Sequence, residues 1–469
     1  MSRARWTQLV ALGIATFAGS YPTAAQRSAA SSDADPLRRR ALVGIGAVRD
    51  DSSSSGVRVT RVTPNGTGAA LGLRDGDVLL RLDTAAMTSV ISFEKVIRSW
   101  RAGQRVSALV RRGGNVVSLD AAAVSYPEER VNGLQIRYGS VVTEYGDRVR
   151  TIVSRPVATT GRRPAILLVP WLSCGSVEMS ITGGPSGTRE VIFGLSLAGY
   201  EVWRVDKPGL GDSEGPDCSE VDYHREVAAY RAAYAELWRS PTVDTTAIVI
   251  FGESLGGSIA PQIALARQPR GIIVQGTYAR SWFEHIIDFE RRRLVLSGGS
   301  PADVSAAVPL LAELYSGYLL EKQTPGEVIR RKPHLASVWY DEPAHQFGRP
   351  AAFYHQVQDA TVAAAWEQIT VPTLIVHGEY DWIMAREDHD LIAEIVNRRQ
   401  AGRARVVSIR GLDHDMLRFP SAQAAFDGTG GVVAPEVLSV MLDWLRQVFR
   451  PSSRDTARLK VLRRWVSGN

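Results

Sequence analysis

The chain lacks several features that would point to particular functions. No basic run is interleaved with aromatic residues, so nucleic acid is not an expected partner. Beyond the N-terminus there is no stretch of about 20 apolar residues, so no further membrane span is expected. The segment Asp388-His389-Asp390 has no second ligand pair, and we expect neither a metal nor another cofactor. What remains is an ordinary globular composition: 45% hydrophobic, 22% charged, and a net charge of +6 carried mostly by arginine.

The N-terminus has the pattern of an export signal. Two arginines among the first five residues precede an apolar stretch from Leu9 to Gly19, which is too short to span a bilayer comfortably. Small residues follow and end at Ala25, where cleavage is expected. We therefore expect a signal peptide at 1–25, a linker at 26–37, and a protein that is exported to the periplasm or secreted. A membrane anchor that is retained is the alternative.

The next segment, residues 38–125, contains an alternating strand at Gly56–Val62, a turn with a short helix, and a helix at Ser89–Ser99. Between them stands the pattern Gly-Leu-x-x-Gly-Asp-x-Leu, matched from Gly72 to Leu79. These features resemble a bacterial PDZ domain, a small and mainly β fold. The resemblance implies a partner: extended peptides or protein C-terminal tails that add a strand to the sheet edge.

By the same resemblance, the loop that receives a peptide carboxylate maps to Val43, Gly44, Ile45 and Gly46. Its glycines leave backbone N–H groups free to face a carboxylate. Gly46 stands where the family often has a bulky residue. The alternative is a module that only packs against its neighbour.

The five residues Gly252-Glu253-Ser254-Leu255-Gly256 carry the clearest chemistry. They follow the apolar, β-branched run Ala247–Phe251 and precede a segment, Gly257–Arg267, that favours a helix. A serine in a tight strand-to-helix turn is held out on a strained backbone, and the helix N-terminus faces any negative charge that forms beside it. The pattern predicts that Ser254 is an activated nucleophile, with a glycine-rich structural turn as the alternative.

From about Val131 onward, predicted strands alternate with predicted helices, which indicates a largely parallel sheet. The expected parallel strands are Ala165–Val169, Glu201–Val205, Ile248–Phe251, Gly271–Val274, Thr373–Val376 and Arg405–Ile409. An antiparallel pair is expected before them, within Leu134–Pro156. With Ser254 after the third parallel strand, residues 131–450 resemble the α/β-hydrolase fold. An insertion at about 278–368 is rich in aromatic residues and in helical patterns, which are expected at Trp282–Leu296, Pro301–Leu320, Pro325–Lys332 and Phe353–Trp366. It resembles the cap that often covers the active site in this fold. Most of its aromatic residues are expected in the cap core and some in the substrate pocket, and 451–469 is left as a tail.

The resemblance implies a serine-hydrolase triad of Ser254, Asp381 and His414. Asp381 follows the strand Thr373–Val376, and His414 follows the last strand, so the chain order is that of α/β-hydrolases. A neutral imidazole takes the serine proton, and a carboxylate fixes the tautomer of the imidazole. Three other residues compete for these roles: Glu379 and Asp388 as the acid, and His377 as the base.

The oxyanion hole requires two backbone N–H groups near the developing charge. Leu255, directly after the nucleophile, is expected to supply one. The loop after Ala165–Val169 supplies the other, but it reads Pro170-Trp171 where many members of the family have His-Gly, and proline has no N–H. Leu172 is the predicted second donor, with Trp171 as the alternative.

Cys174 and Cys218 are the two cysteines of the chain. Both fall in loops after predicted strands, and such loops gather at one edge of a parallel sheet. In an exported protein we expect them to form a disulfide, with two free thiols as the alternative.

Together these features predict an exported serine hydrolase that cleaves ester or amide bonds through an acyl-enzyme. Two alternatives remain. One is a serine peptidase that recruits peptide tails through the PDZ-like module, and the other is a catalytically dead scaffold.

Overall fold

The computed structural model describes residues 37–49, 57–157, 161–179 and 184–449. The expected signal peptide, nearly all of the expected linker and the expected C-terminal tail lie outside the described residues. Among the described residues, no helix is both long and apolar enough to cross a bilayer. The two folded regions predicted from the sequence are both present, and each is described by itself.

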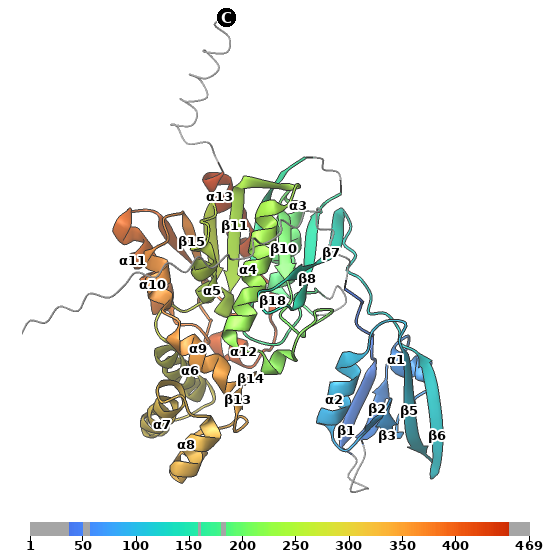
Figure 1. Cartoon of the computed structure of the whole chain (residues 1–469). Coiled ribbons are helices and arrows are strands. Elements are labelled where there is room, and N and C mark those ends of the chain that lie inside the picture. The colour runs from blue at the N-terminus through green and yellow to red at the C-terminus, as the bar shows by residue number, and fades with distance from the viewer. Residues whose placement is uncertain (1–36, 50–56, 158–160, 180–183, 450–469) are drawn as a thin grey trace, which may run out of the picture. The chain divides into compact units, whose positions relative to one another are not determined.

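The first region, in blue and teal in Figure 1, is an antiparallel sheet with two helices. Its strands run in the order β1-β2-β3-β5-β6, and β4 pairs with β3. The strands are β1 Ile45–Arg49, β2 Val57–Val62, β3 Val78–Leu82, β4 Ala85–Ala86, β5 Arg105–Arg112 and β6 Asn115–Ala122, and the helices are α1 Thr67–Leu71 and α2 Val90–Ser99.

Helix α2 begins at a capping box in which the Ser89 side chain accepts the Ser92 N–H. The helix buries Phe93 against the sheet core, and Trp100 directly after it is fully buried. The indole N–H of Trp100 donates to Asp83 at 2.8 Å, so the buried polar atom is satisfied. This order of elements is the one the PDZ resemblance implies.

The second region is built on a mainly parallel sheet with strand order β16-β15-β12-β11-β9-β10-β8-β7. Strands β7 and β8 form the expected antiparallel pair, β8 is antiparallel to β10, and the others are parallel. The strands are β7 Leu134–Val142, β8 Arg148–Pro156, β9 Arg163–Val169, β10 Glu201–Val205, β11 Val243–Glu253, β12 Gly271–Gln275, β15 Thr373–Gly378 and β16 Ala404–Ile409.

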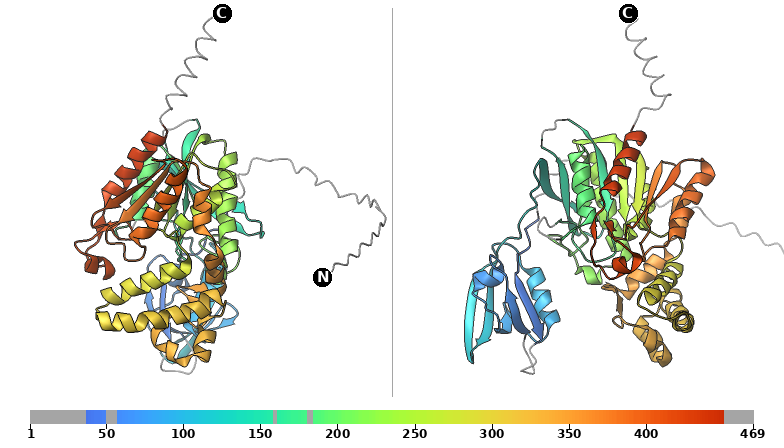
Figure 2. Two further views of the ribbon diagram at one scale, coloured as in Figure 1. Left: turned by 90° about the vertical axis from the view of Figure 1, so that its left-hand side faces the viewer. Right: turned by 180° about the vertical axis from the view of Figure 1, so that it is seen from behind.

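Helices cover both faces of this sheet, which is why its strands read as continuous apolar runs. In β9, alternate residues from Ala165 to Val169 enter two different core clusters, one on each face. One face packs against α4 Tyr223–Arg239, α5 Leu255–Ala264, α10 Val362–Glu367 and α11 Arg386–Arg399. The other packs against α3 Gly187–Leu197 and α13 Pro435–Val448, and α13 is the red helix in the rear view of Figure 2.

The expected cap insertion is helical. Helices α6 and α7 pack side by side (Figure 2, left). Its elements are α6 Trp282–Leu296, α7 Pro301–Tyr315, a π-helical turn at Ser316–Leu320, α8 Pro325–Arg331, a 3-10 turn at Pro333–Val338, the two-residue strands β13 His345–Gln346 and β14 Arg349–Pro350, and α9 Ala351–Asp359.

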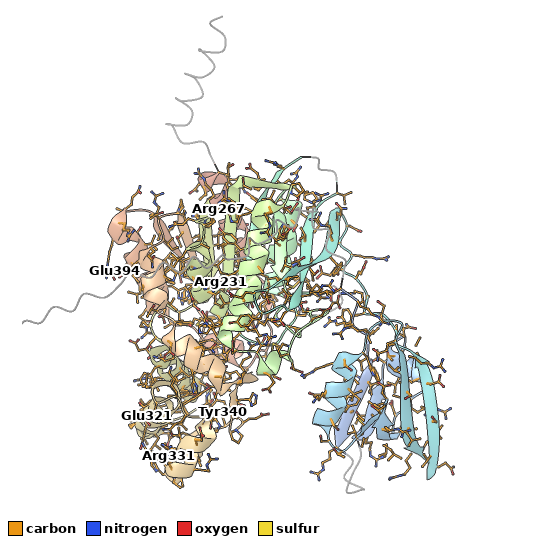
Figure 3. The ribbon with its side chains drawn as sticks, in the orientation of Figure 1. Arg231, Arg267, Glu321, Arg331, Tyr340 and Glu394 are labelled. Atoms are coloured by element: carbon orange, nitrogen blue, oxygen red, sulfur yellow. A yellow bond between two sulfur atoms is a disulfide. The ribbon has the colours of Figure 1, made fainter. Side chains whose placement is uncertain are left out.

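Two of the expected helices differ clearly from the structure. The helix expected at Phe353–Trp366 is two helices, α9 and α10, because Ala360 takes an extended conformation between them. The helix after the nucleophile begins at Leu255 and ends at Ala264, earlier at both ends than expected. Most cap aromatics are buried and form the cap core. Tyr340 (labelled in Figure 3) is half exposed, and its hydroxyl donates to Glu290 at 2.7 Å.

Short elements complete the second region outside the cap. They are a 3-10 turn at Cys218–Glu220, the paired two-residue strands β17 Leu417–Arg418 and β18 Val432–Val433, and α12 Ala422–Phe426.

Candidate active site

Ser254 occupies the turn between β11 and α5, and its backbone is strained. Its φ of 57° and ψ of −126° are unusual for a residue with a side chain. The flanking glycines allow the turn to be this tight. A Cβ on Gly252 would lie 2.6 Å from the Gly256 carbonyl oxygen, and a Cβ on Gly256 would collide with the Val169 carbonyl. This geometry is the one expected for an exposed nucleophile at a strand-to-helix elbow.

The fold brings Ser254, Asp381 and His414 together. His414 Nε2 lies 2.9 Å from Ser254 Oγ, and His414 Nδ1 lies 3.0 Å from Asp381 Oδ2. Asp381 follows β15, and its Oδ1 also accepts the N–H groups of Ile383 and Met384 at 3.0 and 2.9 Å. Those two bonds fix the carboxylate, so its remaining oxygen is held toward the imidazole.

Charge coupling shifts the titration of this pair. Burial disfavours the imidazolium, but the nearby Asp381 carboxylate outweighs burial and raises the pKa of His414. Burial would raise the pKa of Asp381, but the charge and hydrogen bond of His414 and the backbone N–H donors lower it below its usual range. The carboxylate is therefore charged, which favours the protonated form of the neighbouring imidazole.

The rival residues lie elsewhere. Glu379 accepts the Gly411 N–H at 2.8 Å, which supports a turn. Asp388 accepts the N–H groups of Ala279 and Arg280 and pairs with the Arg280 guanidinium at 3.0 Å. His377 contacts Ser408 Oγ at 3.1 Å, away from Ser254. None of these three side chains makes a described contact with Ser254 or His414.

Both predicted oxyanion donors, Leu255 and Leu172, line one pocket with Ser254 and His414. Within the described residues, the N–H groups of Leu172 and Leu255 have no acceptor. The carbonyls of Trp171, Leu172 and Ser173 all accept hydrogen bonds from the buried Lys207. Sequence reasoning missed Lys207, although it stands in the glycine-rich turn that follows β10.

The predicted disulfide is confirmed in the structure. Cys174 and Cys218 are bonded, with their Cα atoms 5.9 Å apart. The bond ties the loop that carries Leu172 to the short 3-10 turn at Cys218–Glu220. Arg349, from the cap strand β14, donates to Cys218 Sγ at 2.9 Å and ion-pairs with Glu226.

The pocket above Ser254 has a volume of about 780 Å³ and is mainly apolar. Cap helix α6 contributes Trp282, Ile286 and Phe289, and the loop after β15 contributes Trp382. Burial lowers the pKa of His285 to about 4, so this histidine lines the pocket as a neutral ring. The sequence marked the cap aromatics as a group, but it gave no signal for which of them face the pocket.

Glu253, directly before the nucleophile, is a pocket residue that sequence reasoning did not select. Burial raises the pKa of Glu253 to about 7, although the Thr188 hydroxyl donates to its Oε1 at 2.7 Å. Its Oε2 is buried without a hydrogen-bond partner in the described structure. The sequence showed that Glu253 occupies the first variable position of Gly-x-Ser-x-Gly, but it did not show that the side chain is buried.

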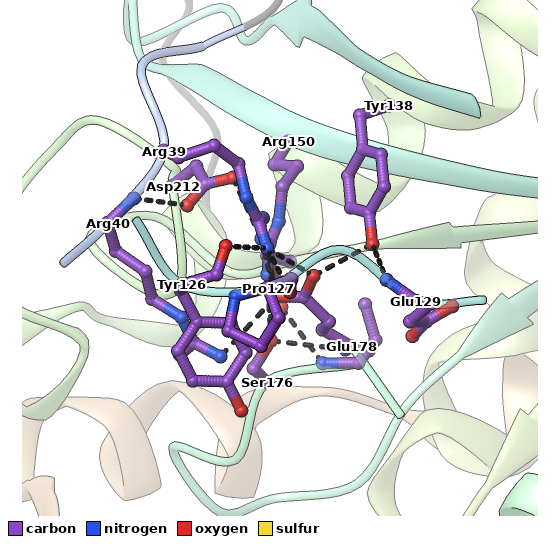
Figure 4. A network of polar contacts seen from close by, with 12 residues as sticks. Arg39, Arg40, Tyr126, Pro127, Glu129, Tyr138, Arg150, Ser176, Glu178 and Asp212 are labelled. Atoms are coloured by element: carbon purple, nitrogen blue, oxygen red, sulfur yellow. Dashed lines mark hydrogen bonds and ion pairs between the residues drawn. The ribbon is translucent and has the colours of Figure 1, made fainter. Parts of the chain in front are cut away.

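Figure 4 shows a network of polar contacts around Glu178. Glu178 lines the pocket and accepts hydrogen bonds from Arg39 at 2.7 Å, Arg150 at 2.9 Å and the Tyr138 hydroxyl at 2.8 Å. Burial would raise the pKa of Glu178, but Arg150 and Arg39 outweigh burial and lower it. Asp212 accepts from the same two arginines, at 2.6 and 2.9 Å. Arg39 and Arg40, which precede β1, therefore bind the Glu178 carboxylate that lines the pocket.

The loop predicted to bind a peptide carboxylate lies at the start of β1. Gly44 has a φ of 64°, and β1 is the edge strand of its sheet. Among the described residues, the N–H groups of Val43 and Gly44 have no acceptor, while the Gly44 carbonyl accepts the Thr63 N–H at 2.8 Å. Ile45 and Gly46 belong to β1 itself. The structure therefore leaves N–H donors beside an edge strand, and their role stays a prediction.

In the described ranges, no group of three His, Cys, Asp or Glu side chains is arranged to hold a metal ion.

Comparison with known proteins agrees with both regions. Residues 187–419 match the family of serine aminopeptidases, S33, and residues 41–122 match the PDZ domain family. The esterase EstD of Thermotoga maritima is 22% identical over 261 residues, which is 55% of this chain and 56% of that esterase. The match thus spans just over half of the length of that relative.

Several solved structures were also matched. The ferulic-acid complex of Est1E from Butyrivibrio proteoclasticus is 17% identical, with 65% of this chain and 98% of that chain covered and a TM-score of 0.42. The esterase domain of a Rhodothermus marinus protein is 16% identical, with 67% and 98% covered and a TM-score of 0.40.

The fold and the family matches define an esterase-like α/β hydrolase with an N-terminal PDZ domain. Its sheet is mixed and mainly parallel, and the preceding domain is antiparallel. More narrowly, the hydrolase domain belongs to the S33 family.

Proposed function

We propose that this protein hydrolyses carboxylic esters through an acyl-enzyme formed on Ser254. The observation that carries the proposal is the chain of contacts from Ser254 Oγ through His414 to Asp381 at the base of an apolar pocket. His414 takes the serine proton as Oγ attacks the ester carbonyl, and then gives it to the leaving alcohol. Water attacks the acyl-enzyme in the second half of the reaction, with His414 again as the base.

The oxyanion of each tetrahedral intermediate is assigned to the N–H groups of Leu255 and Leu172. Support comes from their shared pocket, from their unused N–H groups and from the position of Leu255 at the first turn of α5. There the helix dipole also favours negative charge.

The pocket lining favours a bulky, apolar acyl or alcohol group. Trp282, Phe289 and Trp382 present aromatic rings, and Trp171 stands next to the proposed oxyanion donor. Such surfaces gain affinity from burial of apolar area, by about 25 cal/mol per Å². We therefore place esters with aromatic or long aliphatic groups ahead of acetate esters.

A fluorophosphonate probe and a panel of substrates test the proposal. The probe should label the wild-type protein at Ser254 and leave Ser254→Ala unlabelled, as read by mass spectrometry of the tryptic peptides. In the panel, p-nitrophenyl esters of increasing acyl size should be cleaved faster than p-nitroanilides. A folded wild-type protein that neither reacts with the probe nor cleaves any ester would overturn the proposal.

A second candidate is the hydrolysis of aminoacyl amides. Aminopeptidases need a carboxylate for the substrate ammonium, and two acidic residues beside Ser254, Glu253 and Asp415, have no ion-pair partner in the described structure. Glu178 is not available because it is bound to Arg39, Arg40 and Arg150. Faster cleavage of aminoacyl anilides than of the matched N-acetylated anilides would favour this candidate over the ester hydrolase.

For the PDZ domain we propose binding of peptides with a free C-terminal carboxylate and an apolar last residue. The unused N–H groups of Val43 and Gly44 beside the edge strand β1 support this role. Fluorescence anisotropy should show weak binding of such a peptide and no binding of its C-terminal amide. Equal binding of the two peptides would exclude carboxylate recognition.

We also propose that the protein is exported. The Cys174–Cys218 disulfide supports this, because such bonds persist in oxidising compartments. Fractionation of cells that express the full chain should recover the protein outside the cytoplasm and shortened by about 25 residues, as expected for a signal peptide. An intact N-terminus in the membrane fraction would instead indicate a retained anchor.

A further inference from the structure

Lys207 is a fully buried cation that is bound to the loop beside the nucleophile. It follows β10 and is 1% exposed. Its Nζ donates to the carbonyls of Trp171 at 2.6 Å, Leu172 at 2.9 Å and Ser173 at 2.6 Å. An ammonium has three N–H donors and no acceptor. Three successive carbonyls therefore use the full donor capacity of the charged form.

This contact fixes the direction of the loop N–H groups. The described chain contains no cis peptide bond. In a trans peptide the N–H points away from the C=O of the same unit. The Trp171 carbonyl shares its peptide with the Leu172 N–H, and the Leu172 carbonyl shares its peptide with the Ser173 N–H. Because both carbonyls face Lys207, both N–H groups face away from it.

The loop that Lys207 binds also borders the pocket of the proposed reaction centre. Leu172 and Ser173 line the pocket that also contains Ser254 and Leu255. An ammonium at the oxygen end of a peptide also polarises that peptide and strengthens its N–H as a donor, because hydrogen bonds in a chain reinforce one another. The cation thus acts on the N–H groups that an oxyanion would meet, without touching the oxyanion.

A buried scaffold holds Lys207 from the other side. Glu226 of α4 lies 3.5 Å from Nζ, and the Tyr230 hydroxyl donates to the same carboxylate at 2.9 Å. Arg349 of β14 ion-pairs with Glu226 and contacts the Cys174–Cys218 disulfide. A buried ammonium without such partners would be strongly disfavoured.

We propose that Lys207 is a positioning residue of the oxyanion hole: its ammonium holds the carbonyls of residues 171–173 and so aims the Leu172 N–H at the developing oxyanion. The inference rests on the proposed acyl-transfer function and adds a residue to it. This contact should stabilise the transition state more than the bound ester, because the oxyanion develops only as the serine attacks the carbonyl.

The charge of Lys207 is within reach of an ordinary pH titration. Burial, assisted by the nearby Arg349 cation, lowers the pKa of Lys207 to about 8, although the Glu226 and Asp206 carboxylates oppose that change. These three charged groups face Lys207: Arg349 from β14, Glu226 from α4, and Asp206 from the adjoining turn. The neutral amine has two donors for three carbonyls, so the hold weakens as pH rises through the pKa of Lys207.

Lys207→Met is the direct test, with Arg204→Met as the matched control. Arg204, three residues earlier, is also a buried cation. It pairs with Glu129 at 2.7 Å and donates to the Val177 carbonyl at 2.8 Å, and its contacts in the described structure do not include residues 171–173. Both variants lose a buried cation, and only one loses the hold on the loop. For Lys207→Met we expect kcat on a p-nitrophenyl ester to fall about 100-fold, with KM changed less than about threefold. For Arg204→Met we expect a lower melting temperature with kcat kept.

Three outcomes decide the matter. A folded Lys207→Met protein with wild-type kcat would overturn the inference, and so would an equal loss of kcat in the Arg204→Met control. If Lys207→Met does not fold, Glu226→Gln replaces it. Without the carboxylate the ammonium is less stable, so the alkaline limb of kcat should move to lower pH, and an unmoved limb would overturn the inference.

Fluorophosphonate labelling separates this inference from the proposed function. Labelling of the wild type at Ser254 tests the function alone. If the wild type is labelled and folded Lys207→Met is labelled at the same rate, the function stands and the role of Lys207 fails. If the wild type is not labelled, the function itself fails.

Discussion

Two loops at the same edge of the sheet are held in different ways. The nucleophile turn, Gly252–Gly256, owes its shape to its own residues: glycines at the close approaches and a strained φ of 57° at Ser254. The loop proposed to bind the oxyanion, Pro170–Cys174, has no comparable local signal. Residues elsewhere in the chain fix its position. Lys207 binds its carbonyls, the disulfide links it to Cys218, and the cap residue Arg349 contacts that disulfide. The proposed site thus joins one part that is encoded locally to another that depends on distant residues.

The largest effect should come from the nucleophile itself. Ser254→Ala removes one oxygen from a turn whose shape depends on its neighbours, so the fold should survive while kcat falls at least about 1,000-fold. Ester hydrolysis and circular dichroism check the two halves of this expectation. His414→Ala is the companion variant, with a similar loss. An active Ser254→Ala protein would show that another residue attacks the ester.

Asp381→Asn should reduce kcat by about 10²-fold to 10⁴-fold, because an amide orients the imidazole poorly and does not stabilise the imidazolium. The pH profile should change as well. Asp381 raises the pKa of His414, so in the wild type kcat/KM increases with pH up to values above the ordinary range of histidine. Without the carboxylate the acid limb should move to lower pH. An unchanged profile would direct attention to Glu379 or Asp388.

Loss of the disulfide should have an intermediate effect, and it tests the external hold on the oxyanion loop. A cross-link over a sequence separation of 44 residues stabilises a protein by up to about 4 kcal/mol in the chain-entropy description. The double variant Cys174→Ser/Cys218→Ser should therefore melt earlier, and kcat should fall about tenfold at temperatures where it is still folded. Unchanged kcat with a lower melting temperature would limit the bond to a role in stability.

The smallest effect should come from Arg39→Gln. Arg150 remains on Glu178 at 2.9 Å, so the carboxylate stays paired and kcat on a small ester should stay within about threefold of the wild type. The matched control is Arg105→Gln, because Arg105 is exposed and pairs with Asp120 within the PDZ sheet. Every residue proposed for catalysis lies beyond Val131. Removal of residues 26–125 should therefore also leave the hydrolysis of small esters largely unchanged. A tenfold loss for Arg39→Gln alone would make the segment before β1 part of the active site.

Much of the fold could be predicted because its signals are local. Apolar runs such as Ala165–Val169 mark buried strands, and the helix at Trp282–Leu296 was predicted with the boundaries of α6. The single expected helix at Phe353–Trp366 was wrong in one respect, since Ala360 interrupts it. Alanine favours helices, and only the packing of α9 and α10 decides that the chain turns there.

The sequence alone determined the nucleophile turn, the order of Ser254, Asp381 and His414, and the PDZ signature, because each rests on residues that are adjacent or on the sequence of elements. The tertiary structure decided which acid meets His414, which aromatics face the pocket, and that Lys207 lies under the oxyanion loop. These are contacts between residues far apart in the chain, such as Lys207 with Trp171. Periodicity and short motifs describe neighbours along the chain, and long-range contacts arise only when the sheet, the helices and the cap pack together.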